Sequence, residues 1–197
     1  MATDRPARPP RPQIVLEVLD RIQLSPHLVR IVAGGPGIAQ VEDNGCTDAY
    51  SKMLFAHPET ALTPPYDLAA LRAELPIELL PSVRTYSIRR FDLANGCIWV
   101  DFVVHGDTGI AGPWADQAEP GDLLVLMGIG GAYAPDPDAD WHLLAGDDAA
   151  IPAIASALEA MPAHAQGVAL IEVDGDADHL PLTAPEGIEI QWLHRDG

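Results

Sequence analysis

The sequence predicts a mainly β domain followed by the opening of an α/β layer, and three observations support this division. Six short segments with strand-like patterning, separated by turn signals, lie within residues 14–136. Beyond them, residues 140–197 alternate apolar strand-like runs with a helical run, which is typical of a parallel sheet. The chain has 197 residues and is 48% hydrophobic, enough for one complete domain and a small second unit.

The first segments alternate apolar and polar residues and end at glycine or proline. The expected strands cover 13–23, 27–33, 46–56, 83–92, 97–106 and 122–131. Ser25-Pro26 marks the first turn, and Asn95-Gly96 between two strand-like runs is a hairpin signal. Six such strands predict either a closed antiparallel barrel or a sandwich. The N-terminal tail, residues 1–13, is rich in proline and arginine and is expected to be disordered.

One segment between the strands has a different period. Leu68, Leu71 and Leu75 recur at helical spacing. Asp67 before them suits an N-cap position, and Pro76 ends the run. A short helix is therefore expected between the third and fourth strands.

The second part begins after Pro135-Asp-Pro137-Asp, and we place the domain boundary at 136–140. Strands are expected at 141–146, 167–173 and 188–194, with a helix at 147–161 between the first two. Pro152 fits this helix only because it lies in the first turn. Strand, helix and strand in this order make the opening of a parallel α/β layer.

The charge of the chain excludes one class of partner. Lys and Arg total 11 against 29 Asp and Glu, so the formal net charge is -18 and the sequence pI is about 4.4. Proteins that bind nucleic acids present a basic face, so we expect no nucleic-acid partner. Three arginines, Arg84, Arg89 and Arg90, nevertheless fall within seven residues of the run VRTYSIRRFD. An anionic ligand would be held locally, by such arginines and by backbone amides.

Other function classes lack a signal in the sequence. No apolar run of eighteen or more residues is present, and the N-terminus lacks the apolar stretch of a signal peptide. We therefore expect a cytoplasmic monomer without stable membrane association. Cys46 and Cys97 are separate thiols and are not expected to form a disulfide. The seven histidines are scattered without metal-ligand spacing, so we expect no protein-bound metal, no triad and no catalytic side chain.

Four motifs occur in one order: DAYSKMLF, VRTYSIRRFD, VDFVVHGDTGIAGPWADQAEPGD and LLAGDDAAIPAIASALEAM. With them the chain resembles the siderophore-interacting proteins, flavin-dependent ferric-siderophore reductases of the ferredoxin-reductase superfamily. The resemblance implies a six-stranded antiparallel Greek-key FAD-binding barrel over 14–136 and a partial NAD(P)-binding α/β domain over 140–197. It also implies FAD as cofactor, NAD(P)H as electron donor and a ferric siderophore as partner.

The run around Arg84 suits a flavin chemically. A guanidinium is a planar fork of donors that matches phosphate oxygens, so Arg84 suits the FAD pyrophosphate. On a strand, Tyr86 points to the same side, where its ring can lie on the flavin face. Thr85 and Ser87 complete the motif, and in the family a Ser or Thr hydroxyl lies near N5 of the ring. The alternative is a solvated arginine cluster with Tyr86 in the core.

A glycine-rich turn provides the second half of the expected cofactor site. Glycines allow close backbone approach, and a helix starting at Pro113-Trp114 would present free amides to an anion. The resemblance implies that this turn covers the FAD pyrophosphate. Its candidate residues are His105, Thr108, Gly109, Ala111, Gly112 and Trp114. The alternative for the turn is an ordinary loop, and the alternative for His105 is a strand-end histidine with a structural partner.

The loop after the strand at 141–146 is the expected nicotinamide site, because loops at the carboxyl ends of parallel strands bind such cofactors. Asp147 is the candidate residue, although Asp147 and Asp148 repel phosphate unless they serve as caps. Ala149 stands where the family usually has a threonine. The alternative is a capped helix without a ligand. Family members usually continue beyond the point where this chain stops, so we expect an incomplete nicotinamide domain and impaired hydride transfer.

Basic side chains near the flavin are the expected contacts of an anionic ferric siderophore. Lys52, the only lysine, matches a basic position of the family, and Arg89 is a second candidate. The alternative for Lys52 is a surface charge of the barrel. Three functions remain open: a reductase that passes electrons from NAD(P)H through FAD to chelated Fe(III), a binding module without turnover, and a reductase of the same fold with another acceptor.

Overall fold

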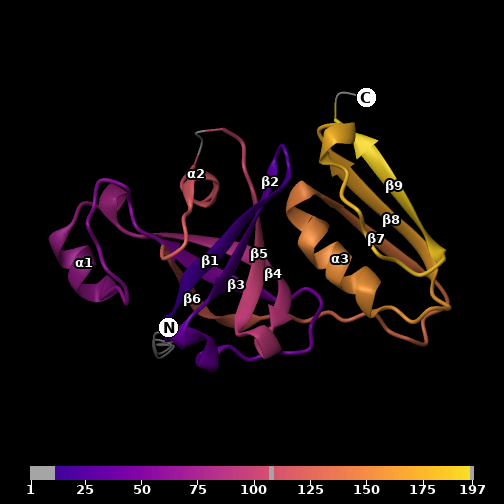
Figure 1. Ribbon diagram of the computed structural model, residues 1–197, viewed down its shortest axis with the longest axis horizontal. Helices are drawn as coiled ribbons and strands as arrows, with labels where there is room; N and C mark the ends of the chain where they lie inside the picture. The colour runs from indigo at the N-terminus through magenta and orange to yellow at the C-terminus, as the bar shows by residue number, and fades with distance from the viewer. Residues whose placement is uncertain (1–11, 107–108, 196–197) are drawn as a thin grey trace, which may run out of the picture.

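The structure is a computed structural model that describes residues 12–106 and 109–195, and it contains two units side by side (Figure 1). The first is a closed barrel with the strand order β1-β2-β5-β4-β3-β6. Its strands are β1 (Ile14–Ser25), β2 (Leu28–Gly34), β3 (Tyr50–Phe55), β4 (Ser82–Asp92), β5 (Cys97–Val103) and β6 (Leu123–Gly130). All neighbours are antiparallel, and β2 pairs with β5 while β6 pairs with β1, as in a Greek key. The predicted barrel is confirmed, and the sandwich alternative is excluded.

Inward-facing strand residues fill the barrel with apolar side chains. Leu16, Ile31 and Leu126 are completely buried. The rings of Phe55 and Phe102 pack edge to face among them, with centroids 6.2 Å apart. Because successive strand residues point to opposite faces, this packing explains the alternation of apolar and polar residues in the sequence.

A buried ion pair joins two barrel strands. Arg30 of β2 and Asp101 of β5 are in register, and the guanidinium donates two hydrogen bonds to the carboxylate, at 2.7 and 2.8 Å. The Asp101 side chain is only 2% exposed. The Arg30 guanidinium also lies over the Trp99 ring, 4.8 Å from its centroid. This carboxylate depends on its arginine, because an unpaired buried charge is strongly destabilising.

The second unit is a parallel three-stranded sheet with one helix against it (Figure 1). Its elements are β7 (His142–Asp147), the 3-10 turn η4 (Asp148–Ala150), α3 (Ile151–Ala160), β8 (Gln166–Val173), the 3-10 turn η5 (Asp176–Asp178) and β9 (Gly187–His194). Ile154 and Leu158 of α3 share one buried cluster with Ile171 of β8. A Cβ atom on Gly146 would lie 2.3 Å from the Cβ of Ala150, so glycine lets β7 pass close to the helix start.

Helix α3 connects the two units because it also packs against β4. The Ser156 hydroxyl of α3 donates to the Arg89 carbonyl of β4 at 2.9 Å, and the Arg89 guanidinium donates to both carboxylate oxygens of Glu159. A second contact joins the turn after β1 to η5. There the Ser25 hydroxyl donates to the buried Asp178 carboxylate at 2.7 Å.

Several predicted boundaries were wrong. The third strand begins at Tyr50 rather than at residue 46, because Asp48 accepts backbone hydrogen bonds from Ala132 and Tyr133 and holds the preceding segment in a loop. The fifth strand ends at 103 rather than 106. The predicted disordered tail ends too late, since Gln13 exchanges two hydrogen bonds with the backbone of Tyr66, and residues 1–11 lie outside the described part.

The helices are shorter than predicted or begin elsewhere. α1 (Leu68–Glu74) starts at its predicted N-cap, where Asp67 accepts hydrogen bonds from two backbone amides. α2 (Ala111–Gln117) begins two residues before the predicted Pro113. The helix predicted at 147–161 starts as η4. The remaining 3-10 turns are η1 (Pro36–Gln40), η2 (Ile77–Leu79) and η3 (Leu93–Asn95). Within the described ranges, none of the helices has the length and apolar character needed to cross a bilayer.

Arg30→Met should lower the free energy of unfolding by about 3–5 kcal/mol, because the Asp101 carboxylate would stay buried without its partner. Arg90→Met is the matched control: Arg90 also lies over Trp99, 5.0 Å from the ring centroid, but its side chain is exposed. Loss of an exposed cation–π contact costs only about 0.5–1 kcal/mol. Urea denaturation followed by circular dichroism measures both variants, and equal losses would contradict the dependence of Asp101 on Arg30.

Candidate functional site

A hollow of about 340 Å³ lies where the barrel meets the α/β unit, and we call it the junction hollow. One wall comes from β4, another from the glycine-rich turn and the start of α2, and a third from the loop after β7. The lining residues are Arg84, Thr85, Tyr86, Val103, His105, Gly109, Ile110, Ala111, Gly112 and Ala149. The fold therefore brings together most of the residues predicted to hold the cofactor.

Arg84 is a cation of this hollow that has no carboxylate partner among the described residues. It lies two residues before Tyr86, so both side chains stand on one face of β4. Its guanidinium donates one hydrogen bond, to the Val83 carbonyl at 2.8 Å. Carboxylates bind four other arginines, which are Arg21, Arg30, Arg89 and Arg195. No carboxylate in the described ranges is within ion-pair distance of Arg84. Its remaining N–H groups are available to an anionic ligand.

Tyr86 lines the junction hollow and also packs into the barrel core. Its ring lies 4.3 Å from the Phe102 ring and 6.4 Å from the Phe55 ring, centroid to centroid. Burial raises the pKa of the Tyr86 hydroxyl, and the nearby Arg84 charge only partly opposes this. The phenol therefore remains a protonated donor at neutral pH. The two predicted roles of Tyr86, wall of a site and core residue, are combined in one side chain.

The glycine turn meets its predicted requirement for close packing. Gly109 has a φ of +85°, which residues other than glycine rarely adopt. A Cβ atom on Gly112 would lie 3.1 Å from the Val103 carbonyl oxygen, so the turn passes close to β5. Ala111 is buried below it. Thr108, which we also predicted here, lies outside the described residues.

Trp114 and Ser87, both predicted to contact FAD, do not line the junction hollow, and neither does Asp147. The Trp114 ring packs in the barrel core, 5.3 Å from the Phe55 ring, and borders a different hollow of about 360 Å³ beside α2. Ser87 pairs with Tyr50 of β3, and strand alternation turns it to the opposite face of β4 from Tyr86. Contacts of Trp114 and Ser87 with FAD stay predictions from the family resemblance.

The two aspartates after β7 have structural partners. The Asp147 carboxylate accepts a hydrogen bond from the Ala149 amide at 3.0 Å and caps η4. Asp148 is buried and accepts two hydrogen bonds from the Arg195 guanidinium, at 3.0 and 2.8 Å. Burial alone would raise the pKa of Asp148, but the bonds and charge of Arg195 outweigh it and lower that pKa. The expected repulsion of phosphate is reduced, because one carboxylate is a cap and the other is neutralised.

Histidines lie where the hollow meets the second unit. His105 lines the hollow, and its ring centroid is 6.1 Å from that of His27. His27 Nδ1 is 2.9 Å from a carboxylate oxygen of Asp178. This hydrogen bond raises the pKa of His27 against the opposing effect of burial. The turn after β1, the end of β5 and η5 are thus joined by polar contacts beside the candidate site.

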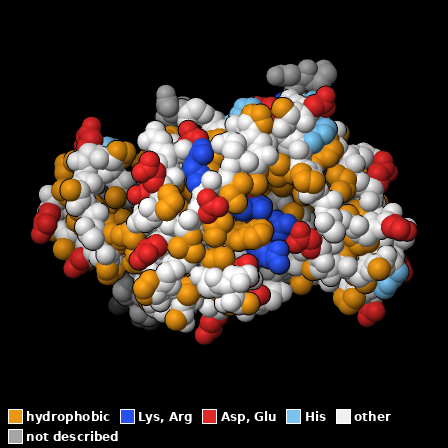
Figure 2. All heavy atoms as spheres, viewed as in Figure 1, with side chains coloured by type: hydrophobic (Ala, Val, Ile, Leu, Met, Phe, Trp, Pro, Cys, Tyr) orange, Lys and Arg blue, Asp and Glu red, His pale blue; other side chains and the backbone are white. Residues whose placement is uncertain are grey.

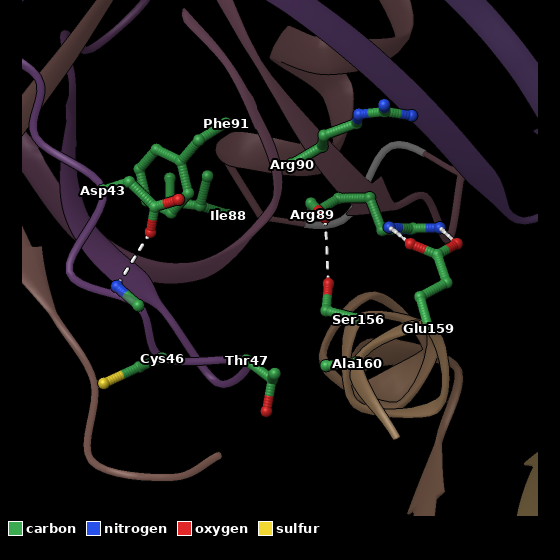
Figure 3. A pocket seen from close by; sticks show the side chains of 11 residues that line it. Asp43, Cys46, Thr47, Ile88, Arg89, Arg90, Phe91, Ser156, Glu159 and Ala160 are labelled. Carbon is green, nitrogen blue, oxygen red and sulfur yellow. Dashed lines mark hydrogen bonds and ion pairs between the residues drawn. The ribbon is translucent and has the colours of Figure 1, made fainter. Parts of the chain in front are cut away.

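The two cationic candidates for the siderophore have different surroundings. Lys52 is exposed on β3 and lies opposite Thr85 in register, one strand from the junction hollow. Arg89 lies against α3, where Glu159 binds its guanidinium and only 13% of the side chain is exposed (Figure 3). Arg89 borders a separate hollow of about 310 Å³. Since its charge is neutralised there, Lys52 is the better siderophore candidate.

The face of the molecule drawn in Figure 2 carries charged groups of both signs. Figure 2 shows cationic side chains gathered near the middle of this face with carboxylates beside them. Arg30 and Arg90 both lie over Trp99 in β5, and Arg30 is bound by Asp101. Both arginines are therefore held by side chains of β5.

One group of potential metal ligands was not predicted from the sequence. The ligand atoms of Asp176, His179 and His194 lie within 4.8 Å of one another. The Asp-x-x-His spacing of 176–179 was an available signal. His194, however, is on another strand, and only the parallel pairing of β8 with β9 places it beside the other two. The structure does not test whether an ion binds, so the expectation of no protein-bound metal stays a prediction.

Comparison with known proteins agrees with the family resemblance inferred from the four motifs. Residues 17–133 match the siderophore-interacting FAD-binding domain model, and residues 139–197 match the siderophore-interacting protein model. The chain is 48% identical over 190 residues to an uncharacterized protein of Mycobacterium tuberculosis, covering 95% of this chain and 67% of that protein. It is 43% identical over 119 residues to ferric vibriobactin reductase of Vibrio cholerae, covering 59% of this chain and 43% of the reductase.

A solved structure extends the similarity to the whole described fold. The crystal structure of a siderophore utilization protein from T. fusca superposes with a TM-score of 0.79 and 35% sequence identity. The match covers 95% of this chain and 71% of the solved chain. Barrel and α/β unit therefore share one arrangement with that protein.

Asp147→Ala should lower the free energy of unfolding by about 0.5–2 kcal/mol, because η4 loses its N-cap. Asp147→Asn should lose much less, since the amide oxygen can accept the same hydrogen bond. Chemical denaturation of the two variants measures the difference. If both variants lose the same stability, the carboxylate acts through its charge and not as a cap.

Proposed function

Because the chain belongs to the siderophore-interacting protein family, we propose that it binds FAD at the junction hollow and reduces ferric siderophores with electrons from NAD(P)H. The main support is one hollow that combines the free guanidinium of Arg84, the Tyr86 ring and the glycine turn. FAD would supply the redox chemistry, taking two electrons as a hydride and passing them singly to Fe(III). Siderophores hold Fe(II) far more weakly than Fe(III), so reduction would release the iron.

The residues of the junction hollow fit part of an FAD molecule. Its volume is near the lower end of the range for small-molecule sites, about 300–1,000 Å³, so the rest of the cofactor would lie along the surface. Arg84 offers a planar fork of donors to phosphate, and Tyr86 offers a ring face and a hydroxyl. Gly112 lets the backbone come close. The protein's part is position and electrostatics, and no side chain has to act as an acid or base in electron transfer.

The loop after β7 is the proposed place of the nicotinamide. Ala149 of this loop lines the junction hollow, so the loop and the proposed flavin site share a wall. The family's threonine hydroxyl is absent at Ala149. Of the acidic pair, however, Asp147 serves as the cap of η4 and Asp148 is neutralised by Arg195. This removes one reason to expect poor binding of a phosphate-bearing donor. This favours turnover over a binding module that lacks it.

Two cations of the described residues, Lys52 and Arg84, are the proposed contacts of the ferric siderophore. Lys52 on β3 and Arg84 on β4 belong to paired strands, and neither has a carboxylate partner among the described residues. In a chain of net charge -18, two such local charges would direct an anionic chelate to the hollow. A reductase with another acceptor would not need them. Cytoplasmic location and a monomeric state stay predictions from the sequence.

Arg84→Ala should weaken FAD binding by roughly 10- to 150-fold, the equivalent of about 1.5–3 kcal/mol for a hydrogen bond to a charged group. Arg90→Ala is the control, because Arg90 is on the same strand, is exposed and does not line the hollow. Quenching of flavin fluorescence during titration with apoprotein gives both dissociation constants. If the two variants lose equal affinity, Arg84 is not the phosphate ligand.

Anaerobic absorbance measurements separate the two halves of the proposed reaction. Excess NADPH or NADH should bleach the visible band of bound oxidised flavin, and a ferric siderophore should then restore it. One fully reduced flavin should release two Fe(II) ions to a colorimetric chelator, because each Fe(III) takes one electron. Lys52→Gln should slow only the second step, since it removes a charge that attracts the chelate.

Two results would replace this function with its alternatives. Flavin that dithionite reduces but neither nucleotide does, and that a ferric siderophore still oxidises, would indicate a module without NAD(P)H turnover. Flavin that a nucleotide reduces but only a quinone or another acceptor oxidises would indicate a reductase with a different substrate.

A further inference from the structure

Three metal-ligating side chains converge at the edge of the α/β sheet, outside the junction hollow. His179 Nε2 and His194 Nε2 are 2.9 Å apart. Asp176 Oδ1 lies 3.3 Å from His194 Nε2 and 3.9 Å from His179 Nε2. Two imidazole nitrogens and one carboxylate oxygen therefore face a common point.

We propose that Asp176, His179 and His194 form a binding site for a divalent first-row transition metal ion such as Zn²⁺ or Fe²⁺. Imidazole suits Zn, Cu, Fe and Ni, and two histidines with one carboxylate make a donor set known for ions of this class. Three protein ligands leave at least one position of the ion for water or another oxygen ligand. The site is thus of the open, exchangeable kind.

The observed spacing is close to what one ion requires. Ligand atoms bound at 2.0–2.2 Å to the same ion lie roughly 3–3.5 Å from one another. The three measured separations, 2.9, 3.3 and 3.9 Å, bracket that range. Side-chain shifts of a few tenths of an ångström would complete the coordination, with no movement of the strands.

The hydrogen bond between the two rings also leaves a ligand atom available. Two protons cannot occupy the 2.9 Å gap between His179 Nε2 and His194 Nε2. Whichever ring donates, the other presents a lone pair to the gap. A metal ion would take the place of the shared proton, which would move to Nδ1 of the donating ring, and would bind both Nε2 atoms, with Asp176 neutralising part of its charge.

The surrounding structure positions the backbone of all three residues and restrains the His179 ring. His194 is the last residue of β9 and pairs with Val173 of β8, where the chain turns into η5. Asp176 begins η5, and His179 follows it directly. The His179 ring stacks on Trp192, with centroids 4.6 Å apart and planes 16° apart. Such packing restricts the ring orientation, as supporting residues do in established metal sites.

The local charges distinguish this group from an ordinary cluster of carboxylates. Arg195 binds the neighbouring carboxylates of Asp174 and Glu172, at 2.6 and 2.9 Å. Among the described residues, only the two histidines lie within ion-pair distance of Asp176. Its side chain is 90% exposed, so an ion can reach it from solvent. The inference does not depend on FAD binding or on reductase activity.

Tag-free protein titrated with Co²⁺ or Ni²⁺ tests the proposal, because a paramagnetic ion at His179 should quench the fluorescence of the stacked Trp192. We expect saturable binding of one ion per chain, competition by Zn²⁺ and Fe²⁺, and no response to Mg²⁺, which prefers oxygen ligands. His179→Ala and His194→Ala should each weaken binding by at least roughly 10- to 100-fold. Trp192→Phe should remove the optical signal while calorimetry still detects one ion.

His164→Ala is the matched control, since His164 is exposed on the same unit but outside the group. Asp176→Asn is a second test variant. Because this side chain is exposed, we expect the substitution to leave the fold intact. Circular dichroism verifies the folding of all variants. The proposal is overturned if binding is not saturable at one ion, if the variant with both histidines replaced retains it, or if His164→Ala weakens it as much as His179→Ala.

Discussion

The packing of α3 against β4 is the interaction on which the arrangement of the candidate site depends. β4 is at once a barrel strand, a wall of the junction hollow and the surface that receives α3. Ser156 and Glu159 of α3 bind the backbone and side chain of Arg89, so the helix cannot move far along the strand. Because α3 follows directly on η4, this contact also sets where Ala149 meets the hollow.

The pairing of most described arginines with carboxylates explains how the acidic chain can keep a specific anion site. Four described arginines are bound by carboxylates. One of them, Arg195, binds three carboxylates, those of Asp148, Asp174 and Glu172. In each pair the opposite charges lie close together, so the pair adds little field outside the molecule. Arg84 and Lys52 have no such partner in the described ranges, so their charge remains available to a ligand. Local charge, rather than net charge, therefore decides which anions this protein can hold.

The fold was predictable from the sequence because each strand carries its own alternating pattern, although the strand order came only from the family resemblance. The site was predictable where it depends on neighbours in sequence, as for Arg84 with Tyr86 and for the glycine turn. Pairs distant in sequence left no local signal: Ser25 with Asp178 is one example, and His194 with Asp176 is another. Only the paired strands and docked units bring them together.

A single irregularity in β4 decides which face of the strand its last arginine occupies. Tyr86 and Ile88 alternate onto the inner face of the strand, which would turn residue 90 inward as well. Between Ile88 and Arg90, however, β4 advances two residues while β5 advances one, from Val100 to Trp99. This bulge shifts the alternation, so Phe91 packs toward the core and Arg90 lies outside over Trp99.

The three arginines of one short run therefore serve three purposes. Arg84 precedes the bulge and lies at the junction hollow, Arg89 lies in the bulge and binds α3, and Arg90 follows it and stacks on the barrel surface. A regular strand would have placed Arg90 in the apolar interior, at the energetic cost of an unpaired buried charge. The bulge allows a strand with a concentration of positive charge to be part of a closed barrel and still leave one guanidinium free for a ligand.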